Sequence, residues 1–129
     1  MRAAVIWSMG ILIMGCRSEE GIKVFNSLPV AEITSHSDGH TFVEGDSVSF
    51  IATISDSNHT EDELLVTWYS GTDVICSESA VTADGIVQCQ VGIQADWEDI
   101  RVQAIDPAGG AGSDSILIDV QVNATPVVQ

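Results

Sequence analysis

Seven short segments of this chain alternate between apolar and polar residues. The clearest spans residues 47–55, where Val48, Phe50, Ala52 and Ile54 alternate with mostly serine and threonine. Successive side chains of a β-strand point to opposite faces of a sheet, so this period predicts strands that bury one face and expose the other. The seven predicted strands cover residues 30–35, 47–55, 64–70, 73–76, 85–92, 99–106 and 113–123. No window outside the N-terminal segment has a sustained helical period, and we predict an all-β protein.

Turn-forming residues separate the segments. Seven short strands within about 95 residues, with such turns between them, are typical of an immunoglobulin-like antiparallel sandwich. Residues 106–112 read Asp-Pro-Ala-Gly-Gly-Ala-Gly. Proline fixes φ and glycine accepts positive φ, so the last two strands should form an antiparallel hairpin.

Several short motifs occur in an order that resembles PKD-type and related immunoglobulin-like modules. These are residues 26–31 (Asn-Ser-Leu-Pro-Val-Ala), residues 45–50 (Gly-Asp-Ser-Val-Ser-Phe), Trp68, and the turn that begins at Asp106. The sequence after Trp68 departs from the Gly-Asp-Gly turn of PKD domains, so the resemblance favours a generic immunoglobulin-like module. It implies a non-catalytic unit of a bacterial surface or secreted protein that often occurs in tandem.

The N-terminus has the pattern of an export signal. Arg2 is followed by an apolar stretch, residues 3–15, which we predict to be a helical signal segment. This stretch is shorter than the roughly 20 residues that a membrane-spanning helix needs. The residues Ile13-Met14-Gly15-Cys16 resemble the lipobox of bacterial lipoprotein precursors. The resemblance implies cleavage after residue 15 and lipidation of Cys16.

Lipidation would place the exported chain on a membrane. Arg17, rather than aspartate, follows the cysteine, which by analogy with Gram-negative lipoproteins favours the outer membrane. A signal peptide that is cut elsewhere, giving a secreted protein, is the alternative. All 19 acidic residues but only three of the four basic ones follow Cys16. This charge excludes nucleic acid as a partner and opposes binding to anionic lipid, so the lipid alone would hold the domain to the membrane.

Two cysteines, Cys76 and Cys89, remain once Cys16 is assigned to lipid. An exported protein occupies a compartment where disulfides persist, so we predict a bond between them. They bracket a turn signal, Asp84-Gly85, and could face each other across a hairpin or adjacent strands. The C-x-x-C spacing of zinc sites is absent. Both cysteines follow Trp68, so the bond is not the B–F bridge of antibody domains.

Acidic residues gather in two predicted loops and could bind calcium, which takes six to eight oxygen ligands. The candidate ligands are Asp56, Glu61, Asp62 and Asp106. The chain lacks the calcium loop of an EF-hand, and a solvated acidic loop is the alternative. We expect His36, His40 and His59 to lie at the surface. We predict no other cofactor.

The predicted organisation is a signal peptide (1–15), the lipidated cysteine and a polar tether (16–28), the sandwich (29–122), and a linker or second repeat (123–129). Asn, Pro and Val recur 97 residues apart, at Asn26/Asn123, Pro29/Pro126 and Val30/Val127, which favours a tandem repeat. We detect no catalytic motif and predict a spacer or interaction module with an unknown protein or carbohydrate partner. The alternative is a calcium-dependent or carbohydrate-binding adhesin, in which Trp97 stacks on a sugar instead of packing in the core.

Overall fold

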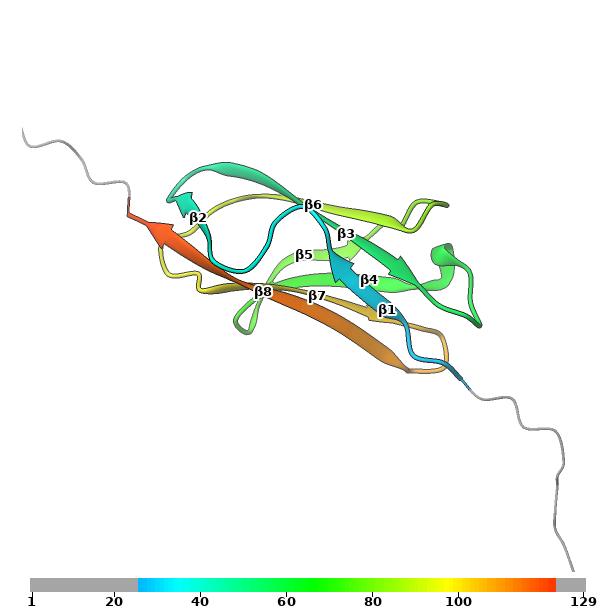
Figure 1. The fold of residues 1–129 in the computed structure, drawn as a ribbon. Coiled ribbons are helices and arrows are strands. Elements are labelled where there is room, and N and C mark those ends of the chain that lie inside the picture. The colour runs from blue at the N-terminus through cyan, green and yellow to red at the C-terminus, as the bar shows by residue number, and fades with distance from the viewer. Residues whose placement is uncertain (1–25, 123–129) are drawn as a thin grey trace, which may run out of the picture.

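The computed structural model describes residues 26–122, which form two stacked β-sheets (Figure 1). The predicted helical signal segment and residues 123–129 lie outside this part. The strands are β1 (Val30–Ile33), β2 (His40–Val43), β3 (Ser47–Ser55), β4 (Leu65–Ser70), β5 (Asp73–Ser79), β6 (Ile86–Gly92), β7 (Asp99–Ile105) and β8 (Ala111–Gln121). A short 3-10 helix, Glu61–Glu63, precedes β4. Within residues 26–122 no helix is long and apolar enough to cross a membrane.

One sheet has the strand order β1-β3-β6 and the other the order β2-β8-β7-β4-β5. Most of the side chains that face inward are those that the alternation predicts, and Phe50, Trp68 and Val102 are completely buried. The exceptions are Phe42 and Ile93, which are buried outside the predicted strands, and Val122, which the alternation places inward but which is exposed. The predicted all-β sandwich is therefore confirmed. Burying each large apolar side chain stabilises the fold by about 1.5–3 kcal/mol.

Residues 26–122 contain one strand more than the sequence predicts. Strand β2 lies between the first two predicted strands, where we expected no strand, and it pairs in parallel with β8, with Phe42 opposite Val120. It has four residues and one buried side chain, Phe42. A single apolar residue has no period, which is why the alternation does not reveal this strand.

The predicted hairpin of the last two strands is confirmed. Strands β7 and β8 pair antiparallel from Asp99 opposite Leu117 to Ile105 opposite Ala111. The Asp106 carboxylate holds the turn, because its Oδ1 accepts hydrogen bonds from the backbone N–H groups of Ala108 (3.0 Å) and Gly110 (2.8 Å).

Strand β5 is longer than the predicted segment 73–76 and runs to Ser79. Its pairing with β4 shifts register twice, between Val66 and Trp68 and between Trp68 and Tyr69. Each shift places an extra residue on β5, and Glu78 there has a φ of 49°. Bulges of this kind interrupt the two-residue period, so the second half of β5 does not look like a strand in the sequence.

The chain enters the sandwich at one end and leaves it at the other (Figure 1). At the entry end, the Asn26 amide donates to Asp106 Oδ2 (2.9 Å), and Pro29 is buried. The Pro29 carbonyl lies so close to Gly112 that a Cβ there would be 1.8 Å from its oxygen. Residues 26–28, which we assigned to the tether, thus pack against the domain.

Candidate functional site

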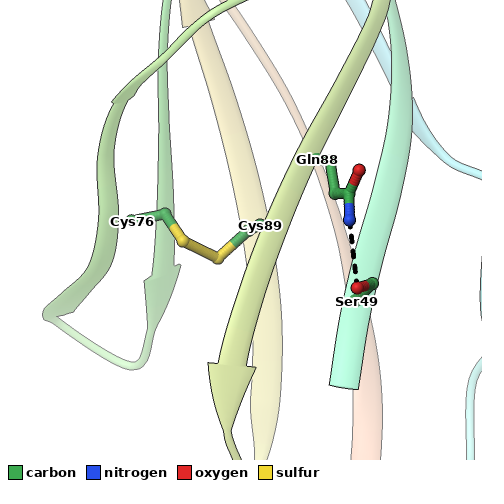
Figure 2. Close-up of a disulfide and its surroundings, with 4 residues drawn as sticks. All are labelled: Ser49, Cys76, Gln88 and Cys89. Atoms are coloured by element: carbon green, nitrogen blue, oxygen red, sulfur yellow. Dashed lines mark hydrogen bonds between the residues drawn. A yellow bond between two sulfur atoms is a disulfide. The ribbon is translucent and has the colours of Figure 1, made fainter. Parts of the chain in front are cut away.

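The predicted disulfide is present and links the two sheets. Cys76 of β5 and Cys89 of β6 have their Cα atoms 5.9 Å apart. Figure 2 shows the bond between the two strands, which follow each other in the chain but belong to different sheets. The cysteines therefore do not face each other across a hairpin; the bond connects an edge strand of one sheet to an edge strand of the other.

The aromatic core adjoins the disulfide. Cys76 pairs with Trp68 across β5 and β4, and Cys89 pairs with Phe50 across β6 and β3. The Phe50 and Trp68 rings pack with centroids 6.3 Å apart. On the outer face, Gln88 beside Cys89 donates to Ser49 Oγ at 3.0 Å (Figure 2). The bond thus closes the sandwich over its largest buried side chains.

The predicted calcium ligands do not all meet. Asp56 and Asp106 come together at the entry end, and His59 joins them. Asp62 instead accepts a hydrogen bond from the Thr60 hydroxyl. The aliphatic part of Glu61 lies near Gly85. The structure thus assembles two of the four candidates and adds an imidazole that we expected at the surface.

Asp56, His59 and Asp106 form a compact group. His59 Nδ1 lies 3.4 Å from Asp56 Oδ1 and 4.0 Å from Asp106 Oδ2. The Asp56 and Asp106 side chains are fully buried, and His59 is 18% exposed. Burial opposes the charge on Asp106, but hydrogen bonds from Asn26 and from the Gly110 and Ala108 backbone lower its pKa overall. The signal for His59 in the sequence is its position three residues after Asp56 in the same loop.

A shallow pocket of about 250 Å³ lies at the end of β4, beside the loop from β6 to β7. Its walls are formed by Ser70, Gly71, Thr72, Asp73, Asp96, Trp97, Glu98 and Asp99. Trp97 is half-buried and packs against the core. It therefore has the predicted packing role and also lines an acidic pocket.

The histidines near the start of the chain are not both at the surface. His36 is half-buried. The centroid of its ring lies 5.1 Å from that of Phe50, 5.2 Å from that of Phe42 and 4.8 Å from that of His40. Burial, with the charge of His40 adding to it, lowers the pKa of His36. The surface prediction for His36 was wrong, because β2 brings Phe42 beneath the ring.

Comparison with solved structures identifies the architecture. Titin domain M4 is 19% identical, with a TM-score of 0.52 over 76% of this chain and all of that domain. A chimeric titin Z1Z2 carrying a decorin peptide is 14% identical, with a TM-score of 0.54 over 77% of this chain and all of that one. The I67–I69 fragment of I-band titin has a TM-score of 0.54 at 14% identity, over 78% of this chain and 34% of the fragment.

The chain has an immunoglobulin-like fold. No protein-family model and no curated protein matches it. In this immunoglobulin-like domain, β3 and β7 occupy the places of the strands that carry the cystine of antibody domains. Neither strand contains cysteine, and the bond joins β5 to β6 instead.

Proposed function

We propose that this chain is a lipid-anchored, non-catalytic immunoglobulin-like module that acts outside the cytoplasm, as a spacer or interaction domain of a bacterial surface protein. The observation that carries the proposal is the placement of entry and exit at opposite ends of the sandwich (Figure 1). A module with this geometry separates whatever precedes it from whatever follows. The 97-residue recurrence and the PKD-type resemblance support a tandem arrangement of such modules.

The pairing between β2 and β8 suits a module that bears load along its length. These strands are parallel, with His40 opposite Ile118 and Val43 opposite Gln121. Force applied from the entry end to β2 and from the exit end to β8 would load all of their hydrogen bonds together. The bonds would then resist as a group instead of opening one after another.

Support for export comes from the cysteines. A buried structural disulfide is typical of oxidising compartments and rare in the cytosol. Cys76 and Cys89 are paired, which leaves Cys16 for a different use. A diacylated cysteine holds a protein stably, whereas one acyl chain does so only marginally.

The serine hydroxyl that lies beside an imidazole has a structural partner, which supports a non-catalytic role. The Ser35 hydroxyl contacts the His36 imidazole at 2.8 Å, a distance at which a base could activate a nucleophile. The same oxygen accepts the N–H of Ile51 at 2.9 Å. Ser35 thus fastens the start of the β1–β2 loop to β3.

Expression of the full-length chain in a Gram-negative host tests the anchor. We expect an N-terminal peptide that begins at Cys16 and carries diacylglycerol by mass spectrometry, in outer-membrane fractions. Cys16→Ser should abolish the modification, and Arg17→Asp should move the protein to the inner membrane. A wild-type chain cut at another residue and recovered free of membrane would refute the anchor and support plain secretion.

The acidic pocket favours carbohydrate binding as a second candidate function. Trp97 could stack on a sugar ring while Asp73 and Asp96 bind its hydroxyl groups. Glycan-array binding that Trp97→Ala abolishes, with the melting temperature little changed, would support this adhesin function. Binding that survives Trp97→Ala would refute the pocket as its site.

A further inference from the structure

The loop between β3 and β4 and the turn between β7 and β8 bury two carboxylates against each other. The Asp56 carboxyl group contacts that of Asp106, and neither side chain is exposed to solvent. Both carboxylate oxygens of Asp106 accept hydrogen bonds, from the Asn26 amide and from the backbone N–H groups of Ala108 and Gly110. Asp56 is not, because only its Oδ1 has a donor, the N–H of Asn58 at 2.8 Å.

Two buried atoms in this group have no hydrogen-bond partner: Asp56 Oδ2 and His59 Nδ1. Buried polar atoms are nearly always paired, and each exception calls for a partner that the protein itself does not supply. An unpaired buried carboxylate oxygen is especially costly, since the charge has lost its water.

The described chain offers no fixed positive charge to balance the two carboxylates. Arg101 is the only lysine or arginine within residues 26–122. Its guanidinium lies over the Tyr69 ring, 4.2 Å from the centroid. Within residues 26–122, a positive charge beside the two carboxyl groups can come only from His59 or from a bound cation.

We propose that Asp56, His59 and Asp106 bind a divalent transition-metal ion of the zinc class. One donor atom from each residue lies within 4.8 Å of the other two. Closing these gaps around an ion with bonds of about 2.0–2.2 Å needs only small side-chain movements. A mixed set of imidazole nitrogen and carboxylate oxygen suits zinc, whereas calcium takes only oxygen ligands and more of them.

Asn26 acts as a positioning residue for the ion. Its amide donates to Asp106 Oδ2, and such partners orient the ligating carboxylate. The site therefore joins three segments: the entering chain, the β3–β4 loop and the β7–β8 turn. A bound ion would fasten the entering chain to the body of the module.

Calorimetric titration of untagged, chelator-treated full-length protein with Zn²⁺ tests the site, and visible absorption of added Co²⁺ reports its ligand geometry. We expect one ion per chain, a higher melting temperature with Zn²⁺, and a Co²⁺ spectrum of mixed nitrogen and oxygen ligands. Ca²⁺ should bind far more weakly. Failure of Zn²⁺ to bind below millimolar concentration overturns the proposal and leaves the spacer function unaffected.

Matched variants separate this site from general acidic attraction. His59→Ala and Asp56→Asn should each weaken Zn²⁺ binding by about 100-fold or more, and Asn26→Ala by about 10-fold. Glu61→Gln in the same loop and His40→Ala on β2 should leave the Zn²⁺ affinity unchanged. If His59→Ala unfolds the domain, as near-ultraviolet circular dichroism would reveal, His59→Asn takes its place. Equal Zn²⁺ affinity in the wild type and in either folded His59 variant overturns the site.

Discussion

Reduction of the Cys76–Cys89 bond should lower the free energy of unfolding by about 3 kcal/mol. The bond joins residues 13 apart, and closing a loop of about 15 residues removes that much chain entropy from the unfolded state at 25 °C. Domains of this size have a total stability of about 5–15 kcal/mol. A loss of 3 kcal/mol would lower the melting temperature by about 12–24 °C, at about 4–8 °C per kcal/mol.

The folded structure should change little, which makes this effect attributable to the unfolded chain. Cys89 is 1% exposed, and Cys76 is half-buried beside Trp68. Reduction leaves two thiols, which behave as small apolar groups and suit an apolar core. Replacing both cysteines with serine should cost more than reduction, because a hydroxyl buried at position 89 adds about 1–3 kcal/mol if it finds no partner.

Urea unfolding of the Cys16→Ser protein, with and without reductant and followed by tryptophan fluorescence, measures the difference without a third thiol. The expected order of stability is oxidised, reduced, then Cys76→Ser/Cys89→Ser. A reduced protein within about 1 kcal/mol of the oxidised one would refute the loop-closure reasoning. Two reactive thiols in the oxidised protein would refute the bond itself.

Two further predictions concern the packing of the first strands. Gly112→Ala should destabilise the domain by about 3 kcal/mol or more, since its Cβ would lie 1.8 Å from the Pro29 carbonyl oxygen. Gly92→Ala, which meets nothing within 4 Å, is the control, and equal melting temperatures for the two variants would contradict the clash. The free energy of unfolding should fall as the pH drops below about 6.5. Below that pH His36 takes up a proton in the unfolded state, whereas its lowered pKa in the folded state opposes protonation. His36→Gln should reduce the fall in urea midpoint between about pH 7.5 and about pH 5, and an unchanged fall would count against this residue.

The strands that the sequence predicts best are those in which apolar residues of a buried face alternate with polar residues of an exposed face along the whole strand. Residues 47–55 alternate over nine positions, and β3 spans the same residues. Strand β2 escapes prediction because its main partner is the backbone of β8, about 80 residues later. Its identity as a strand depends on tertiary pairing instead of on its own side chains, and local propensity carries no information on that.

For the candidate sites, the sequence predicts which residues take part but not how they are arranged in space. Cysteine number and export predict that Cys76 and Cys89 pair, but the sequence does not reveal that β5 and β6 lie in different sheets. Asp56 and Asp106 are recognisable as candidates because both lie in predicted loops. Their contact depends on which loops share an end of the sandwich, and this follows from the strand order, which one sequence does not specify.

The disulfide and the parallel pair of strands, β2 and β8, lie at opposite edges of the sandwich. On one edge, β1 packs against β8, and Asp114 of β8 accepts the N–H of Ile33 at 2.8 Å; β2 completes this edge. In the proposed spacer function, a force between entry and exit would pass through the hydrogen bonds of these strands. On the other edge, β5 and β6 have no strand pairing between them, and Cys76–Cys89 is the covalent substitute. Because this bond lies at the other edge of the sandwich, it would stabilise the fold against unfolding without carrying the force that the proposed spacer function places on β2 and β8.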